Sequence, residues 1–128
     1  MIQTKNFNSK SDPKLLCTCG HPECDKRSVS QETLDQVQLV REDFGGYMVI
    51  TSGGRCPNHP NEKTKARPGD HQKCFAVDVA CSSLAQETKL KVIGGRHGAT
   101  RVAGTHKDGF IHLAWTPTKD KSVPTWSY

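Results

Sequence analysis

Residues 68–81, PGDHQKCFAVDVAC, place two polar residues, His71 and Asp78, in and just before a short apolar run. The run FAVDVA alternates and is rich in β-branched side chains, which is typical of a strand. A second apolar run, GFIHLAW at 109–115, carries one further polar residue, His112. A zinc site on a small sheet is expected to show this pattern, with one polar residue in each of two strands and one in the loop before the first strand.

Strand parity places Asp78 and His112 each on the less bulky face of its strand. Successive side chains in a strand point to opposite faces. Asp78 therefore shares its face with Ala76 and Ala80, whereas the bulkier Val77 and Val79 point to the other face. If the two strands are neighbours, Asp78 and His112 converge on one metal ion, and His71 reaches it from the preceding loop. Two imidazoles and one carboxylate leave a fourth position open to water, as in catalytic rather than structural zinc sites. There the metal lowers the pKa of water and polarises a carbonyl. The expected cofactor is therefore Zn²⁺.

The remaining periodicity predicts two helices, two further strands and one long surface loop. The predicted helices cover 29–43 and 83–93, the strands 47–51 and 100–103, and the loop 57–69. Ser28 with Gln31, and Ser83 with Gln86, are candidate capping boxes, and Gly94-Gly95 is expected to end the second helix. The order helix, strand, strand, helix, strand, strand predicts an α+β fold with a small, mostly antiparallel sheet.

The length of 128 residues predicts a single domain. Residues 1–27 are expected to form an irregular, cysteine-containing N-terminal segment, and residues 117–128 an irregular tail. No stretch approaches the roughly 18–20 apolar residues of a membrane span. The N-terminus has no apolar core of a signal peptide, so we expect synthesis in a cytoplasm without Sec-type export. The net charge of +5 favours an anionic partner such as a cell wall or nucleic acid.

Four of the six cysteines form a second candidate site. Cys17, Cys19 and Cys24 lie in CTCGHPEC, and Cys56 follows later in the chain. Short-spaced clusters of this kind can hold a structural zinc ion, with Cys56 or His59 as the further ligand. Disulfides or free buried thiols explain the same cysteines equally well, so both interpretations stay open at this point.

The segments ITSGGRC, HQKCFAVDVA and GFIHLAW, in this order, resemble the zinc peptidases of the D-alanyl-D-alanine carboxypeptidase type. That superfamily includes phage L-alanyl-D-glutamate endolysins and shares its fold with the Hedgehog signalling domain. Its SGYR-type motif corresponds to Ser52-Gly53-Gly54-Arg55, its His-x6-Asp motif to His71 and Asp78, and its late Phe-aliphatic-His motif to residues 110–112. CTCGHPEC also resembles the N-termini of phage members. The resemblance covers residues 15–116.

The resemblance implies that His71, Asp78 and His112 are zinc ligands. It also implies that Arg55, with Ser52 beside it, binds a substrate carboxylate or stabilises an oxyanion, which suits the bidentate donors of arginine. The implied reaction is hydrolysis of an amide bond in the peptide stem of bacterial peptidoglycan. The chain would then act at the cell wall as an endolysin, or within a phage virion beside other virion proteins.

Four positions depart from the family pattern. Gly69 replaces a serine, Cys74 a glycine, Ala114 an aspartate, and Gly109 the acidic residue three positions before the last histidine. A general base must come within hydrogen-bond reach of the attacking water, so we predict that Asp108 takes this role.

Two alternatives remain beside the peptidase. The departures at Gly109 and Ala114 motivate a structural virion protein that keeps the fold and the metal without turnover. A zinc-ribbon-like nucleic-acid binder centred on CTCGHPEC leaves the His-Asp-His pattern unexplained and lacks interleaved aromatic residues. We therefore expect no nucleic-acid partner.

Overall fold

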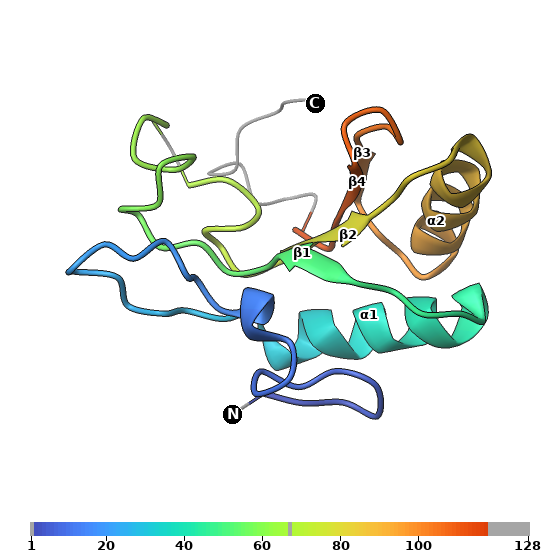
Figure 1. The fold of residues 1–128 in the computed structure, drawn as a ribbon, viewed down its shortest axis with the longest axis horizontal. Coiled ribbons are helices and arrows are strands. Elements are labelled where there is room, and N and C mark those ends of the chain that lie inside the picture. Colours follow the sequence, from blue (N-terminus) through green and yellow to red (C-terminus); the bar gives the residue numbers. More distant parts are fainter. Residues whose placement is uncertain (1, 67, 118–128) are drawn as a thin grey trace.

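Two helices and a four-stranded antiparallel sheet form the part of the chain that the computed structural model describes, residues 2–66 and 68–117. The elements are a 3-10 turn η1 (Pro13–Leu15), α1 (Gln31–Phe44), β1 (Ile50–Ser52), β2 (Ala76–Ala80), α2 (Leu84–Arg96), β3 (Arg101–Ala103) and β4 (Phe110–Ala114) (Figure 1). This is the α+β fold expected, with its elements in the predicted order. No helix in the described ranges is long and apolar enough to cross a membrane.

The strand order is β1-β2-β4-β3, and every neighbouring pair is antiparallel. In this register Asp78 on β2 lies directly opposite His112 on β4 and is also paired with Ser52 on β1. Three residues that are far apart in the sequence therefore lie side by side across the middle of the sheet.

The hydrophobic core lies between the sheet and the two helices. The bulky face of β2 and β4 supplies Val77, Val79, Ile111 and Leu113, and the helices pack Leu34, Val37, Val40, Leu90 and Ile93 against it. Burying one such side chain contributes roughly 1.5–3 kcal/mol. This core fixes the sheet so that Asp78 and His112 face away from both helices.

Both helices begin at serine caps. The Ser83 hydroxyl accepts a hydrogen bond from the backbone N–H of Gln86, as predicted. For α1 the prediction of Ser28 was wrong, because the cap is Ser30, which accepts from the N–H of Thr33. Ser28 instead donates its hydroxyl proton to the carbonyl of Val29.

Two predicted boundaries were also wrong. The second helix does not end at Gly94-Gly95 but continues to Arg96. A Cβ at Gly94 would lie only 2.7 Å from Leu113 Cδ2, so this glycine permits close helix–sheet packing rather than termination. The first strand begins at Ile50 rather than at Tyr47, which is 85% exposed.

The N-terminal segment packs against the glycines that follow β1. An isolated bridge joins Leu16 to Ser28 and brackets the cysteine-containing loop between them. A Cβ at Gly54 would lie 2.2 Å from the Arg27 carbonyl oxygen, so only glycine allows this close approach. Of the tail predicted to be irregular, only Pro117 lies within the described residues.

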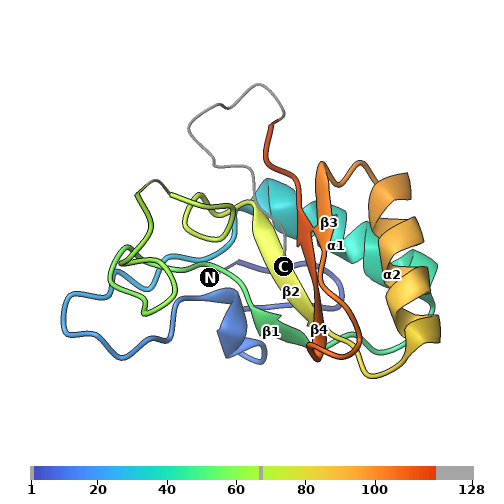
Figure 2. The same ribbon diagram turned by 90° about the horizontal axis from the view of Figure 1, so that it is seen from above.

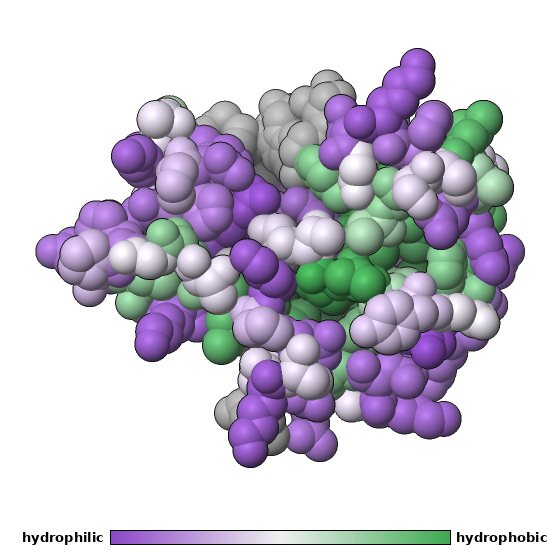
Figure 3. Space-filling view, viewed as in Figure 1, coloured by the Kyte–Doolittle hydropathy of each residue, from purple (hydrophilic) through white to green (hydrophobic). Residues whose placement is uncertain are grey.

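The loops lie at one end of the molecule and α2 at the other. In both ribbon views, residues 17–27, 53–66 and 68–75 extend beyond the end of the sheet that is away from α2 (Figures 1 and 2). The space-filling view shows this loop end as mainly hydrophilic, whereas apolar side chains gather toward the end that carries α2 (Figure 3). The candidate site lies where the loops meet the sheet.

Candidate metal centre

Three side chains that the sequence singles out meet at one point on the polar face of the sheet. His71 comes from the loop before β2, Asp78 from β2 and His112 from β4, and all three are buried. His112 Nδ1 lies 3.0 Å from Asp78 Oδ1 and 3.2 Å from His71 Nε2, which in turn lies 3.1 Å from Asp78 Oδ1. The structure thus brings together the predicted zinc ligands.

The outer nitrogen of each imidazole is held by a hydrogen-bond acceptor. His71 Nδ1 lies 2.8 Å from the carbonyl oxygen of Gly53, and His112 Nε2 lies 2.9 Å from Asp70 Oδ2. These oxygens accept, so each neutral ring carries its proton on the outer nitrogen and a lone pair on the inner nitrogen. Two ring lone pairs and a carboxylate oxygen therefore face one another, which is a donor set suited to a cation such as Zn²⁺.

Burial and hydrogen bonding favour the protonation states that metal binding requires. Burial lowers the pKa of His71, which favours the neutral ring. Burial raises the pKa of Asp78, but the neighbouring His112 and His71 rings outweigh it and hold that pKa below its ordinary value. A neutral imidazole and an ionised carboxylate are the forms that coordinate zinc.

Asp70 is a site residue that the sequence analysis missed. Besides His112, it accepts a hydrogen bond of 2.7 Å from the Thr116 hydroxyl and lies 3.3 Å from an Arg101 guanidinium nitrogen. Burial raises the pKa of Asp70, whereas these hydrogen bonds lower it more, so the carboxyl stays ionised. Its place directly before His71 was the available signal, but its partner His112 lies 42 residues away.

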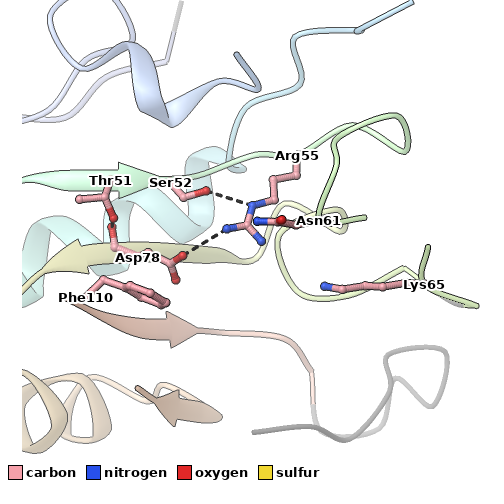
Figure 4. Close-up of a pocket in the computed structure, with 7 residues that line it drawn as sticks. All are labelled: Thr51, Ser52, Arg55, Asn61, Lys65, Asp78 and Phe110. Carbon is pink, nitrogen blue, oxygen red and sulfur yellow. Dashed lines mark hydrogen bonds and ion pairs between the residues drawn. The ribbon is translucent and has the colours of Figure 1, made fainter. Parts of the chain in front are cut away.

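Arg55 borders the cluster on the side of β1. Its Nε donates to the Ser52 hydroxyl at 3.1 Å, and one terminal nitrogen lies 3.3 Å from Asp78 Oδ2 (Figure 4). Asp78 therefore presents one oxygen to the histidines and the other to Arg55. The two residues lie at a cavity of about 400 Å³, which is lined by Thr51, Ser52, Arg55, Asn61, Lys65, Asp78 and Phe110.

Glu62 is a second acid that the sequence analysis missed. Its side chain is buried, and Oε2 lies 3.4 Å from Arg55 and 3.0 Å from Lys65 Nζ. Its other oxygen has no hydrogen-bond partner in the structure as described. Glu62 thereby supports the two cations that line the cavity.

Asp108 lies away from the cluster. Its carboxylate is exposed and accepts hydrogen bonds of 3.1 Å from the backbone N–H and the hydroxyl of Thr105. It lies in the turn before β4, and it is not among the three side chains that meet at the cluster. The structure therefore does not bring the predicted base to the metal ligands.

The four cysteines singled out in the sequence also meet. The sulfur atoms of Cys17, Cys19, Cys24 and Cys56 all lie within 4.8 Å of one another. All six cysteines of the chain are free thiols.

The buried His-Asp-His cluster beside Arg55 offers the ligands of a metal centre, as in metallopeptidases. The family model described as Peptidase M15 matches residues 9–114, which include every element from η1 to β4. The chain therefore belongs to the peptidase M15 family, whose peptidases are zinc-dependent, and the resemblance seen in the sequence is confirmed. A separate search of curated proteins found no match.

Proposed function

We propose that this chain hydrolyses an amide bond in the peptide stem of bacterial peptidoglycan, as a phage endolysin or a virion-associated wall-opening enzyme. The observation that carries the proposal is the convergence of His71, Asp78 and His112 beside the Arg55 cavity in a chain of the M15 family. The net charge of +5 supports an anionic wall polymer as the partner.

His71 Nε2, Asp78 Oδ1 and His112 Nδ1 would hold the zinc ion. When bound, zinc polarises a carbonyl and lowers the pKa of water, which is the chemistry that amide hydrolysis needs. Gly53 and Asp70 keep the lone pair of each ring directed at the ion through the outer nitrogens. Because this support is buried, the ligand geometry is preorganised before the metal arrives.

Arg55 would bind an anionic group of the substrate. The Ser52 hydroxyl accepts a hydrogen bond from Nε, and the two terminal nitrogens lie at the cavity, where they contact Glu62 and Asp78. The planar guanidinium can form two parallel hydrogen bonds to a carboxylate or stabilise a developing oxyanion. The Lys65 amine lines the same cavity and adds positive charge (Figure 4).

Asp108 remains our proposal for the general base, on the strength of its position next to Gly109 in the sequence. A base must lie within about 3 Å of the proton that it accepts, directly or through one water. This role therefore requires the turn at 105–109 to rearrange when substrate binds, releasing the carboxylate from Thr105.

The experiment measures free amino groups released from purified peptidoglycan, with and without added zinc. We expect release by the wild type and none by His71→Ala, while His97→Ala, a histidine that contacts Asp43 instead, serves as the matched control and stays active. Release that His71→Ala leaves intact would refute the zinc mechanism.

A structural virion protein is the second candidate, favoured because the Asp108 carboxylate binds Thr105 and is not part of the cluster. On this alternative the metal stabilises the fold and no bond is cut. Full zinc occupancy at the His-Asp-His cluster without any release of amino groups would select it over the peptidase.

A further inference from the structure

Four cysteine side chains form a compact cluster away from the His-Asp-His site. Cys17, Cys19 and Cys24 lie in the loop bracketed by the Leu16–Ser28 bridge, and Cys56 directly follows Arg55. Cys17 and Cys56 are buried, and the other two are partly exposed. Two segments that are far apart in the sequence thus contribute sulfur atoms to one cluster. Cys19 and Cys56, for example, are 37 residues apart.

The spacing of the sulfur atoms fits a tetrahedral ion. With zinc–sulfur bonds of about 2.3 Å, two sulfur ligands of a regular tetrahedron lie about 3.8 Å apart. Cys19 and Cys56 are 3.6 Å apart, and all four sulfur atoms lie within 4.8 Å of one another. The cluster therefore needs only small adjustments to surround one metal ion.

The backbone N–H of Lys26 also donates a hydrogen bond of 3.4 Å to Cys24 Sγ, two residues earlier in the chain. Backbone N–H groups directed at sulfur stabilise negative charge on a thiolate, which is the form that binds metal. This contact supports a thiolate at Cys24, while the spacing of the sulfur atoms supports all four residues as ligands.

We propose that Cys17, Cys19, Cys24 and Cys56 bind a second, structural zinc ion with four protein ligands. Four thiolates with no position left for water define a closed site, which stabilises a fold and does no chemistry. The site joins the N-terminal loop to the segment that carries Arg55, whose backbone N–H donates to the carbonyl of His71. It thereby positions Arg55 beside the His-Asp-His cluster.

The first test is the zinc content of the full-length chain, purified under reducing conditions. We expect two zinc ions per chain in the wild type, matching the two clusters, and one in Cys24→Ser, Cys56→Ser or His71→Ala. Cys74→Ser, a thiol outside the cluster, is the matched control and keeps both. One zinc ion in the wild type, or no loss in the cluster variants, would overturn the proposal.

The second test needs no cysteine substitution, so it holds even if those variants fail to fold. In His71→Ala loaded with Co²⁺, four thiolates predict intense sulfur-to-cobalt charge-transfer absorption and tetrahedral ligand-field bands. Wild-type protein denatured without reductant should expose six free thiols. Absence of the charge-transfer bands, or only two free thiols, would mean disulfides instead. Neither readout depends on peptidase activity, so the proposed function can fail while this inference stands.

Discussion

At the scale of single residues, the site depends on which nitrogen of each histidine carries the proton. The carbonyl of Gly53 and the carboxylate of Asp70 accept from the outer nitrogens, and this leaves both inner nitrogens as donors to a metal. A substitution that alters one of these acceptors should therefore weaken metal binding although all three metal ligands are unchanged.

Asp70→Asn is the sharpest change of this kind. An amide can present its N–H₂ group to His112 Nε2, which removes the acceptor that holds the proton there. We expect zinc affinity to fall about 10- to 100-fold, the usual effect of such outer-shell changes. Zinc competition with a chelator measures this, and Thr116→Val, which removes only the bond to the other oxygen of Asp70, is the control with a smaller loss. Equal affinities in Asp70→Asn and the wild type would contradict the account.

Asp108→Asn tests the proposed base. General bases contribute about 10²- to 10⁴-fold to rate. We therefore expect kcat to fall by at least about 100-fold while zinc content stays unchanged. A rate within a few-fold of the wild type would mean that Asp108 only holds the turn through Thr105, and the base would have to be sought elsewhere.

At the scale of elements, close packing of α2 on β4 explains why a helix continues through two glycines. A Cβ at Gly94 meets Leu113, whereas a Cβ at Gly95 meets nothing within 4 Å. We expect Gly94→Ala to destabilise the protein by about 1–3 kcal/mol through overpacking. Gly95→Ala should stabilise it by roughly 0.5–1 kcal/mol through helix propensity. Denaturant unfolding of the two variants gives both numbers, and effects of the same sign would contradict this packing.

A hydrogen-bonded pair, Glu87 and His106, joins α2 to the turn that carries Asp108. The side chain and backbone N–H of His106 hydrogen-bond Glu87 and lower its pKa from 4.5 to about 2. A lowered pKa in the folded state stabilises the fold above pH 4.5, and this stabilisation is lost as the pH falls toward 2. Thermal unfolding should therefore show a Tm difference between wild type and Glu87→Gln that is largest above pH 4.5 and closes toward pH 2. A difference that stays constant across this range would rule this pair out as its cause.

At the scale of the whole molecule, local patterns predict the elements, but only the tertiary structure shows how distant groups meet. Alternation in β2 and β4 placed Asp78 and His112 on the polar faces of their strands, and the register makes them direct neighbours. For Asp70 the only sequence signal was its place next to His71, because its role depends on a partner 42 residues away. Gly94 was misinterpreted for the same reason, since the residue that it contacts, Leu113, belongs to another element.

With zinc at both clusters, as we propose, metal ions would fix the loop end on either side of Arg55. Residues 17–27 and 56 meet at the cysteines, and residues 71, 78 and 112 meet at the sheet. The described core lies mainly between the sheet and the helices, so we expect the loops that form the site to depend on these ligands for their positions. Removing metal should therefore loosen the substrate cavity before it unfolds the sheet.

The most direct test of the central claim is anomalous X-ray diffraction at the zinc edge, from crystals of the zinc-loaded wild-type chain. The account predicts an anomalous peak about 2.0–2.2 Å from His71 Nε2, Asp78 Oδ1 and His112 Nδ1. In His71→Ala crystals this peak should be absent. A wild-type map with no peak among these three atoms, at a zinc concentration that saturates the protein, would contradict the account.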